Sequence, residues 1–220
     1  MNNKYVKIAI QLVLLVIAIV LAYLLYRGIM TPIEFNKEKD KRYEATIKKL
    51  IDIRIAEVAY KDVNGKYTDN WDTLINFVKH GKFPIVKKIG TIPEELIDSL
   101  KDFDLAEREA LKMGLISRDT VEVPVLDSLF SKDYPIEQIK YVPYTDNAVF
   151  DLKAGQVKTA SQVVVEVFEA SVHNDVLLHG MNKQLLINLN DEKEQLGRFP
   201  GLKVGDINQA NNNAGNWETL

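Results

Sequence analysis

The sequence predicts an α+β protein: a single N-terminal transmembrane helix, amphipathic and short helices, and then a mostly antiparallel β domain. Three observations predict this class: an apolar run near the N-terminus, helical spacing of apolar residues after it, and short β-rich segments separated by turn residues in the second half. With 220 residues, 46% of them hydrophobic, the chain can form one or two domains. The expected parts are a tail (1–7), a transmembrane helix (8–26), a charged juxtamembrane spacer (27–42), a helical region (43–116) and a β-rich region (117–220). The last two can form one domain, because no Gly/Ser-rich linker separates them.

The transmembrane helix is predicted from "IAIQLVLLVIAIVLAYLLY", in which Gln11 is the only strongly polar side chain. About 19 helical residues span roughly 28 Å, close to the ~30 Å hydrocarbon core of a bilayer. A cleaved signal peptide is the alternative, but the run is longer than a usual signal sequence, and Arg27 follows it where small residues would be needed for cleavage. We expect a retained anchor whose lipid-facing residues include Ile8, Leu12, Leu15, Ile19, Leu24 and Tyr26.

The basic residues around this helix bear on its orientation. Lys4 and Lys7 precede it and favour a cytoplasmic N-terminus, whereas Arg27 and the basic residues of 37–42 follow it and favour the reverse. Of the second group only Arg27 lies close to the hydrocarbon edge. We therefore expect the C-terminal domain on the extracytoplasmic, periplasmic side, with a cytoplasm-facing membrane adaptor as the alternative.

Gly28 and Pro32 are expected to interrupt the helix just outside the membrane, since proline supplies no backbone donor. The run "NKEKDKRYE" (36–44) alternates acids with bases, which is typical of a solvated helix face or spacer. Apolar residues then return at helical spacing, and the expected contact residues are Ile47, Leu50, Ile51, Ile53, Ile55 and Val58. This stripe packs either on the following domain or sideways on neighbouring copies, and Ile53, which lies off its centre, favours the second arrangement.

A turn and a second helix follow in "AYKDVNGKYTDNWDTLINFVKHGKF" (59–83). Asn64-Gly65 marks the turn, because both residues tolerate positive φ. Asp69 or Asn70 can cap a helix that ends at Gly81. "KFPIVKKIG" is a candidate edge strand, and two further helices are expected in "TIPEELIDSL" and "DLAEREALKMG".

Beyond Ser117 the predicted elements are strands of an antiparallel sheet, because the apolar segments are short, β-rich and separated by Gly, Pro, Asn and Asp. These segments are "TVEVPVL" (120–126), "IKYVPY" (139–144), "AVFDL" (148–152), "VVVEVFEA" (163–170), "DVLLHG" (175–180), "QLLINLN" (184–190) and "GLKVG" (201–205).

Residues 8–83 and the later sheet together resemble the architecture of type IV pilins and type II secretion pseudopilins. The resemblance rests on the apolar N-terminal helix, its amphipathic continuation and the motif "AYKDVNGKYTDNWDTL". It implies a membrane-anchored, self-associating envelope component. The processing motif of that group is absent: no glycine precedes the apolar run and no glutamate lies within it. No functional residue is therefore carried over.

Composition excludes several kinds of site. The chain has no cysteine, which removes disulfides, thiol nucleophiles and cysteine-ligated metals. The net charge of −3 gives no general attraction to nucleic acid, and no catalytic motif occurs, so we do not expect an enzyme. No cofactor is expected, although calcium is an alternative because oxygen-bearing side chains cluster near the C-terminus at Asp206, Asn208, Asn211, Asn212 and Asn213. His173, Asp175 and His179 would share one face of a regular strand, a second candidate metal site.

The function expected from these patterns is that of a membrane-anchored structural or interaction component of a cell-envelope complex. Its partners would be the lipid bilayer and other envelope proteins or copies of itself. A tethered extracytoplasmic ligand-binding or sensing module is the alternative, alongside the cytoplasm-facing adaptor.

Overall fold

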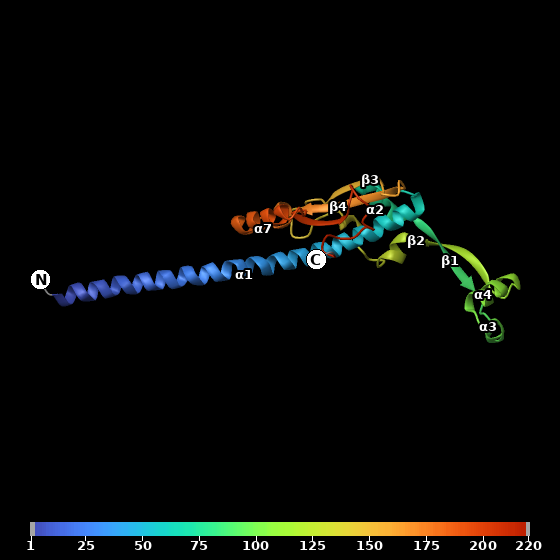
Figure 1. Cartoon of the computed structure of the whole chain (residues 1–220), viewed down its shortest axis with the longest axis horizontal. Coiled ribbons are helices and arrows are strands. Elements are labelled where there is room, and N and C mark those ends of the chain that lie inside the picture. The colour runs from blue at the N-terminus through green and yellow to red at the C-terminus, as the bar shows by residue number, and fades with distance from the viewer. Residues whose placement is uncertain (1–2, 219–220) are drawn as a thin grey trace.

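The computed structural model describes residues 3–218, and its longest element is the helix α1 (Asn3–Asn64), which runs unbroken from the N-terminal end into the folded body (Figure 1). The first half of α1 projects alone, and the second half is part of the body. Residues 3–7, expected as a tail, are helical, while residues 1–2 lie outside the described part.

The expected interruption at Gly28 and Pro32 is wrong, because α1 continues through both residues. Pro32 deprives the Gly28 carbonyl of its helical donor. The Thr31 hydroxyl donates to the neighbouring Arg27 carbonyl at 2.7 Å. One missing bond is tolerated because long helical stretches continue on both sides. Segment 27–42, expected as a charged juxtamembrane spacer, is therefore a continuous part of α1, and its Phe35 is buried against the body.

The body is built on a three-stranded antiparallel sheet that packs against the second half of α1. The strands β3 (Asp151–Lys158), β4 (Val164–His173) and β5 (Gly201–Gly205) lie in that order, with β4 central. Ala154 pairs with Phe168, and Ala170 pairs with Val204. Phe168, Ala170 and Val204 join Leu50 of α1 in one buried core, so the predicted α+β class with an antiparallel sheet is confirmed.

The helix α2 (Trp71–His80) has the caps that the sequence predicts. The Asn70 side chain accepts from the Thr73 backbone N–H at 2.9 Å, and Gly81 follows the last turn. Leu74 and Val78 are buried, which fixes α2 against the body. The sequence 59–83 is thus the end of α1, a turn and a short buried helix.

A projecting arm lies at the end of the body farthest from the N-terminus (Figure 1). It consists of β1 (Lys82–Ile89), α3 (Glu94–Leu100), α4 (Phe103–Lys112) and β2 (Ser117–Pro124). The strands β1 and β2 pair antiparallel, with Ile89 opposite Ser117, and the two helices close their far end. Its exposed apolar side chains include Leu100, Phe103, Leu105, Met113 and Leu115.

The other elements are α5 (Val125–Leu129), the 3-10 helix η1 (Ile136–Gln138), α6 (Asn174–Leu177) and α7 (Lys183–Gln195). Two predicted strands are therefore wrong: 175–180 contains α6, and 184–190 lies in α7. A third, 139–144, contains only an isolated bridge between Tyr141 and Val149. The Asn182 side chain caps α7 by accepting from two backbone N–H groups, and the helix lies back along α1 toward its N-terminal half (Figure 1).

Candidate functional site

The projecting half of α1 is apolar and exposed on every side from residue 5 to residue 29. The six residues predicted to face lipid, Ile8, Leu12, Leu15, Ile19, Leu24 and Tyr26, are all exposed. The most apolar window of this helix has a mean hydropathy of 3.0, and none of it is buried in the body. So large a continuous apolar surface is not stable in water, and its length and composition are compatible with a single-pass membrane anchor.

The six predicted contact residues divide between the core and the surface. Leu50 and Ile53 are fully buried, and Ile47 and Ile51 are half-buried. The expectation that Ile53 would face neighbouring copies is therefore wrong, because it points into the core. Ile55 is 36% exposed, and Val58 is half-buried.

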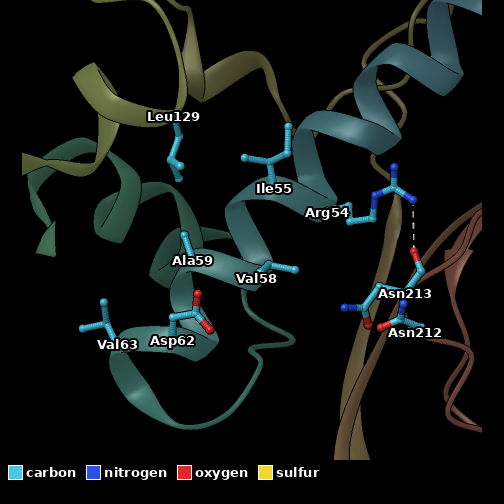
Figure 2. A pocket seen from close by; sticks show the side chains of 9 residues that line it. All are labelled: Arg54, Ile55, Val58, Ala59, Asp62, Val63, Leu129, Asn212 and Asn213. Atoms are coloured by element: carbon cyan, nitrogen blue, oxygen red, sulfur yellow. Dashed lines mark hydrogen bonds between the residues drawn. The ribbon is translucent and has the colours of Figure 1, made fainter. Parts of the chain in front are cut away.

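Ile55 and Val58 line a groove of about 660 Å³ on the outer face of α1 (Figure 2). Ala59 and Val63 continue its floor along the helix, and Leu129 of α5 faces them from across the groove. Asp62 and the Asn212–Asn213 loop add polar groups at its margin. Residues 55, 58, 59 and 63 follow the spacing by which one helix packs against another.

Arg54 fixes the polar side of this groove. Its guanidinium donates to the Asn213 carbonyl at 3.3 Å and forms an ion pair with Glu218 at 2.8 Å. The Asn213 amide donates to the Tyr67 hydroxyl at 2.9 Å. The C-terminal loop is therefore held to α1 beside the groove.

Glu57 lies on the opposite, buried side of α1 and was not foreseen as a core residue. It is fully buried, and its Oε2 accepts from the Thr68 backbone N–H at 3.2 Å. Within residues 3–218, its Oε1 has no hydrogen-bond partner. Burial raises the pKa of Glu57 to about 8, against the opposing effect of the Thr68 hydrogen bond, and the negative charge of Asp69 adds to the increase. The turn after α1 thus closes over a carboxyl that is protonated at neutral pH.

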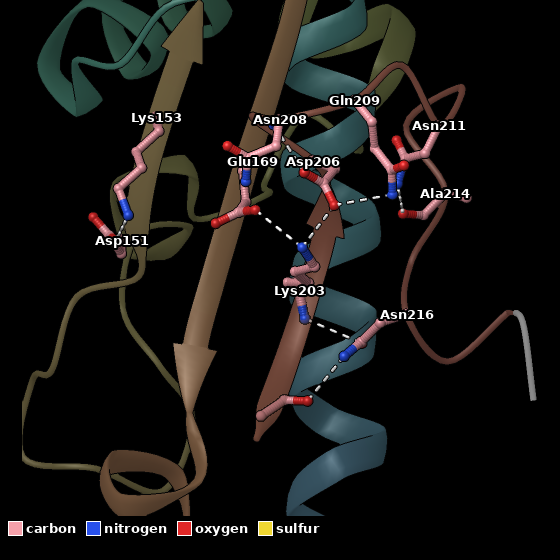
Figure 3. A network of polar contacts seen from close by, with 11 residues as sticks. Asp151, Lys153, Glu169, Lys203, Asp206, Asn208, Gln209, Asn211, Ala214 and Asn216 are labelled. Atoms are coloured by element: carbon pink, nitrogen blue, oxygen red, sulfur yellow. Dashed lines mark hydrogen bonds and ion pairs between the residues drawn. The ribbon is translucent and has the colours of Figure 1, made fainter. Parts of the chain in front are cut away.

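The oxygen-rich C-terminal segment holds a lysine ammonium at its centre (Figure 3). Lys203 Nζ lies 2.9 Å from Asp206 Oδ2 and 3.2 Å from Glu169 Oε2. Burial opposes ionisation of Asp206, but the hydrogen bonds from Lys203 and from the Asn208 N–H lower the pKa of Asp206 overall. The ammonium group occupies the position between these carboxylates that a cation would need.

The predicted metal ligands are not brought together. The Asn211 amide donates to the Ala214 carbonyl at 3.1 Å, Asn212 lies on the surface, and Asn213 is held by Tyr67 and Arg54. The expected strand face of histidines is also wrong, because α6 separates them: His173 caps α6 and His179 follows it. Among the side chains that the structure describes, which leave out those of residues 83–88 and 119–120, no group of three or more His, Cys, Asp or Glu is arranged to hold a metal ion.

No protein-family model, curated protein sequence or solved structure matches this chain significantly.

Proposed function

We propose that this protein is a membrane-anchored structural component of a cell-envelope complex, pilin- or pseudopilin-like in architecture, whose copies associate side by side through the groove on α1. The observation that carries the proposal is that one unbroken helix provides both the apolar membrane segment and the floor of the groove. The proposal gives the chain no catalytic role.

A second copy fits the groove because both copies are held at the same height. At ~1.5 Å per residue, Ile55 lies roughly 44 Å along α1 beyond Tyr26 in every copy. Parallel helices anchored in one membrane therefore place Ile55, Val58 and Val63 of one copy beside the same residues of the other. Such a pairing is self-complementary, as a two-fold interface requires. Confinement to the membrane also raises the effective concentration of copies for each other.

Cysteine crosslinking in native membranes tests this arrangement, and the chain has no cysteine of its own to interfere. Val58→Cys places a thiol on the groove floor, and Lys153→Cys places one on the exposed side of β3. We expect an oxidised dimer with the first variant and little with the second. Equal crosslinking of the two variants, or none with Val58→Cys, would refute association through the groove.

The extracytoplasmic orientation is part of the proposal and has its own test. Ala210→Cys lies in an exposed loop of the body, and Asn3→Cys lies at the start of α1. We expect a membrane-impermeant maleimide to label residue 210 and not residue 3 in intact cells, or in spheroplasts where an outer membrane blocks access. The opposite pattern would support the cytoplasm-facing adaptor.

The size of the groove favours one second candidate, a tethered ligand-binding module. A volume of about 660 Å³ lies in the range of small-molecule sites, and the apolar floor next to the Asp62 carboxylate suits an apolar ligand with a positively charged end. A compound of this type would raise the melting temperature of the wild-type protein but not that of Val58→Arg. If Val58→Cys also failed to crosslink, this second function would replace the first.

A further inference from the structure

The tip of the folded body nearest the membrane is formed by the turn between α6 and α7. Arg42 Nη1 donates to the carbonyls of Leu177 and His179 at 3.1 and 3.2 Å, which fixes the start of this turn on α1. The turn then continues toward the N-terminal half of α1, and α7 returns to the body, where Asn190 accepts from Asn174 at 2.9 Å. Residues 178–185 are therefore the part of the body that reaches farthest back along α1.

A cavity of about 430 Å³ lies beneath this tip. One wall is α1, with Leu24, Arg27, Gly28, Thr31 and Pro32, and the other is the start of α7, with Asn182, Gln184 and Leu185. Leu24 and Leu185 make the cavity partly apolar. The Arg27 guanidinium adds a positive charge to the wall of the cavity.

The height of this cavity matches the headgroup layer of the membrane. If the hydrocarbon core ends near Tyr26, Leu24 lies ~3 Å below that boundary and Pro32 ~9 Å above it, at ~1.5 Å per residue. The headgroup layer on each side of a bilayer is roughly 5–8 Å thick. Ile29 is also exposed on α1 at this level, where contact with the upper part of the lipid would cover it.

We infer that residues 178–185 rest in the headgroup layer and that a phospholipid of that layer occupies the cavity between α1 and α7. Its phosphate lies next to Arg27 and the Gln184 amide, and its glycerol and first acyl carbons contact Leu24 and Leu185. The inference rests on the membrane anchor of the proposed function but not on association of copies. In this arrangement the bilayer contacts the folded body as well as the apolar half of α1.

The test uses the full chain in vesicles of phosphatidylcholine and phosphatidylglycerol that contain a brominated phosphatidylcholine as quencher. An environment-sensitive fluorophore is attached to Lys183→Cys, an exposed tip position that does not line the cavity. Lys153→Cys on β3 is the control in water, and Leu15→Cys in the middle of the apolar run is the control in lipid. We expect the label at 183 to be quenched several-fold more strongly than the label at 153.

Gly28→Leu tests the cavity itself. A Cβ at Gly28 would meet no atom within 4 Å, and Gly28 lines the cavity, so a leucine there extends its side chain into that space. Leucine is also a better helix former than glycine. We expect this change to reduce quenching at 183 while leaving quenching at 15 unchanged.

Three results would overturn the inference in different ways. Quenching at residue 15 with none at residue 183 would support the membrane anchor but refute contact between the tip and the bilayer. Quenching at residue 183 that is as strong in Gly28→Leu as in the unsubstituted cavity would refute the binding of a phospholipid there. A label at 15 that is not quenched would refute the anchor, and with it the proposed function.

Discussion

Replacing Glu57 by glutamine is expected to change the pH dependence of stability. Glu57 is fully buried, and its pKa rises from an ordinary 4.5 to about 8 on folding. Between these pH values the folded protein holds a proton that the unfolded chain has released, so the stability falls as the pH rises. Above pH 8 both states are ionised, and this contribution is constant.

The size of the effect follows from the same two values. Each pH unit between 4.5 and 8 costs about 1.4 kcal/mol, so the free energy of unfolding falls by roughly 5 kcal/mol over this interval. Glu57→Gln removes this loss, because a neutral amide can still accept from the Thr68 N–H and does not ionise. Near pH 5 we expect the variant and the wild type to agree within about 1 kcal/mol, since both then bury a neutral group that accepts the Thr68 hydrogen bond.

The measurement is the melting temperature of the full-length protein in a neutral detergent between pH 5 and pH 9, followed by tryptophan fluorescence. Because ~1 kcal/mol shifts the melting temperature by about 2–4 °C in a domain of this size, Glu57→Gln should melt some 10–20 °C above the wild type at the alkaline end. Asp62→Asn, an exposed carboxyl on the same helix, is the control and should leave the profile unchanged. Parallel profiles for the wild type and Glu57→Gln would refute the reasoning.

Four further substitutions test other parts of the structure by thermal or urea unfolding. Ile53→Ala should lower the free energy of unfolding by about 3 kcal/mol, because it opens a cavity in the core. Ile55→Ala should lower it by less than ~0.5 kcal/mol and instead weaken the crosslink at residue 58. Similar losses of stability at both positions would contradict the assignment of Ile53 to the core and Ile55 to the surface. Lys203→Met should destabilise the protein by about 2 kcal/mol, since it leaves two neighbouring carboxylates without their cation, and an unchanged stability would show that the cluster contributes nothing. Gly205→Ala should cost more than ~2 kcal/mol, because φ is +72° and the new Cβ would lie 2.1 Å from the Phe168 carbonyl; a neutral result would contradict that backbone geometry.

The elements that the sequence predicted well are those whose signals are local. The helix α2 has a capping asparagine before it and a glycine after it, and both signals act within a few residues. The apolar half of α1 was equally clear, because membrane length and lack of charge can be read from one segment. Strand β4, at Val164–His173, lies close to the predicted 163–170.

The errors arise where a local signal competes with tertiary context. Pro32 normally ends a helix, but here one lost hydrogen bond is outweighed by the helix on either side. In "QLLINLN" the apolar run was too short to separate strand from helix, although Leu185 and Leu189 have helical spacing and Asn182 is a capping signal. The burial of Glu57 and Ile53 depends on how α1 is rotated against the sheet, and no single segment encodes this.

For the candidate site, the sequence identified two residues of the groove floor but not the groove. Ile55 and Val58 were predicted as contact residues on α1, and both line it. The opposite wall comes from Leu129 of α5 and the Asn212–Asn213 loop, which are distant in sequence and meet α1 only after folding. The same holds for the cavity beneath α7, because a segment predicted as a strand supplies one of its walls.

The unbroken helix connects the two proposals, because it fixes which face of the membrane segment lies in line with the groove. Thirty-six residues make about ten turns of an α-helix at ~3.6 residues per turn, so Ile19 lies on the same face as Ile55. A pair of copies that meets at the groove must therefore also bring the Ile19 faces together inside the bilayer, apart from any bend at Pro32. Gly28 and Thr31, which form one wall of the lipid cavity, lie on the same helix. The side of α1 on which the cavity opens is therefore fixed relative to a neighbouring copy as well. Whatever orients the transmembrane segments in the membrane then orients the folded bodies above it.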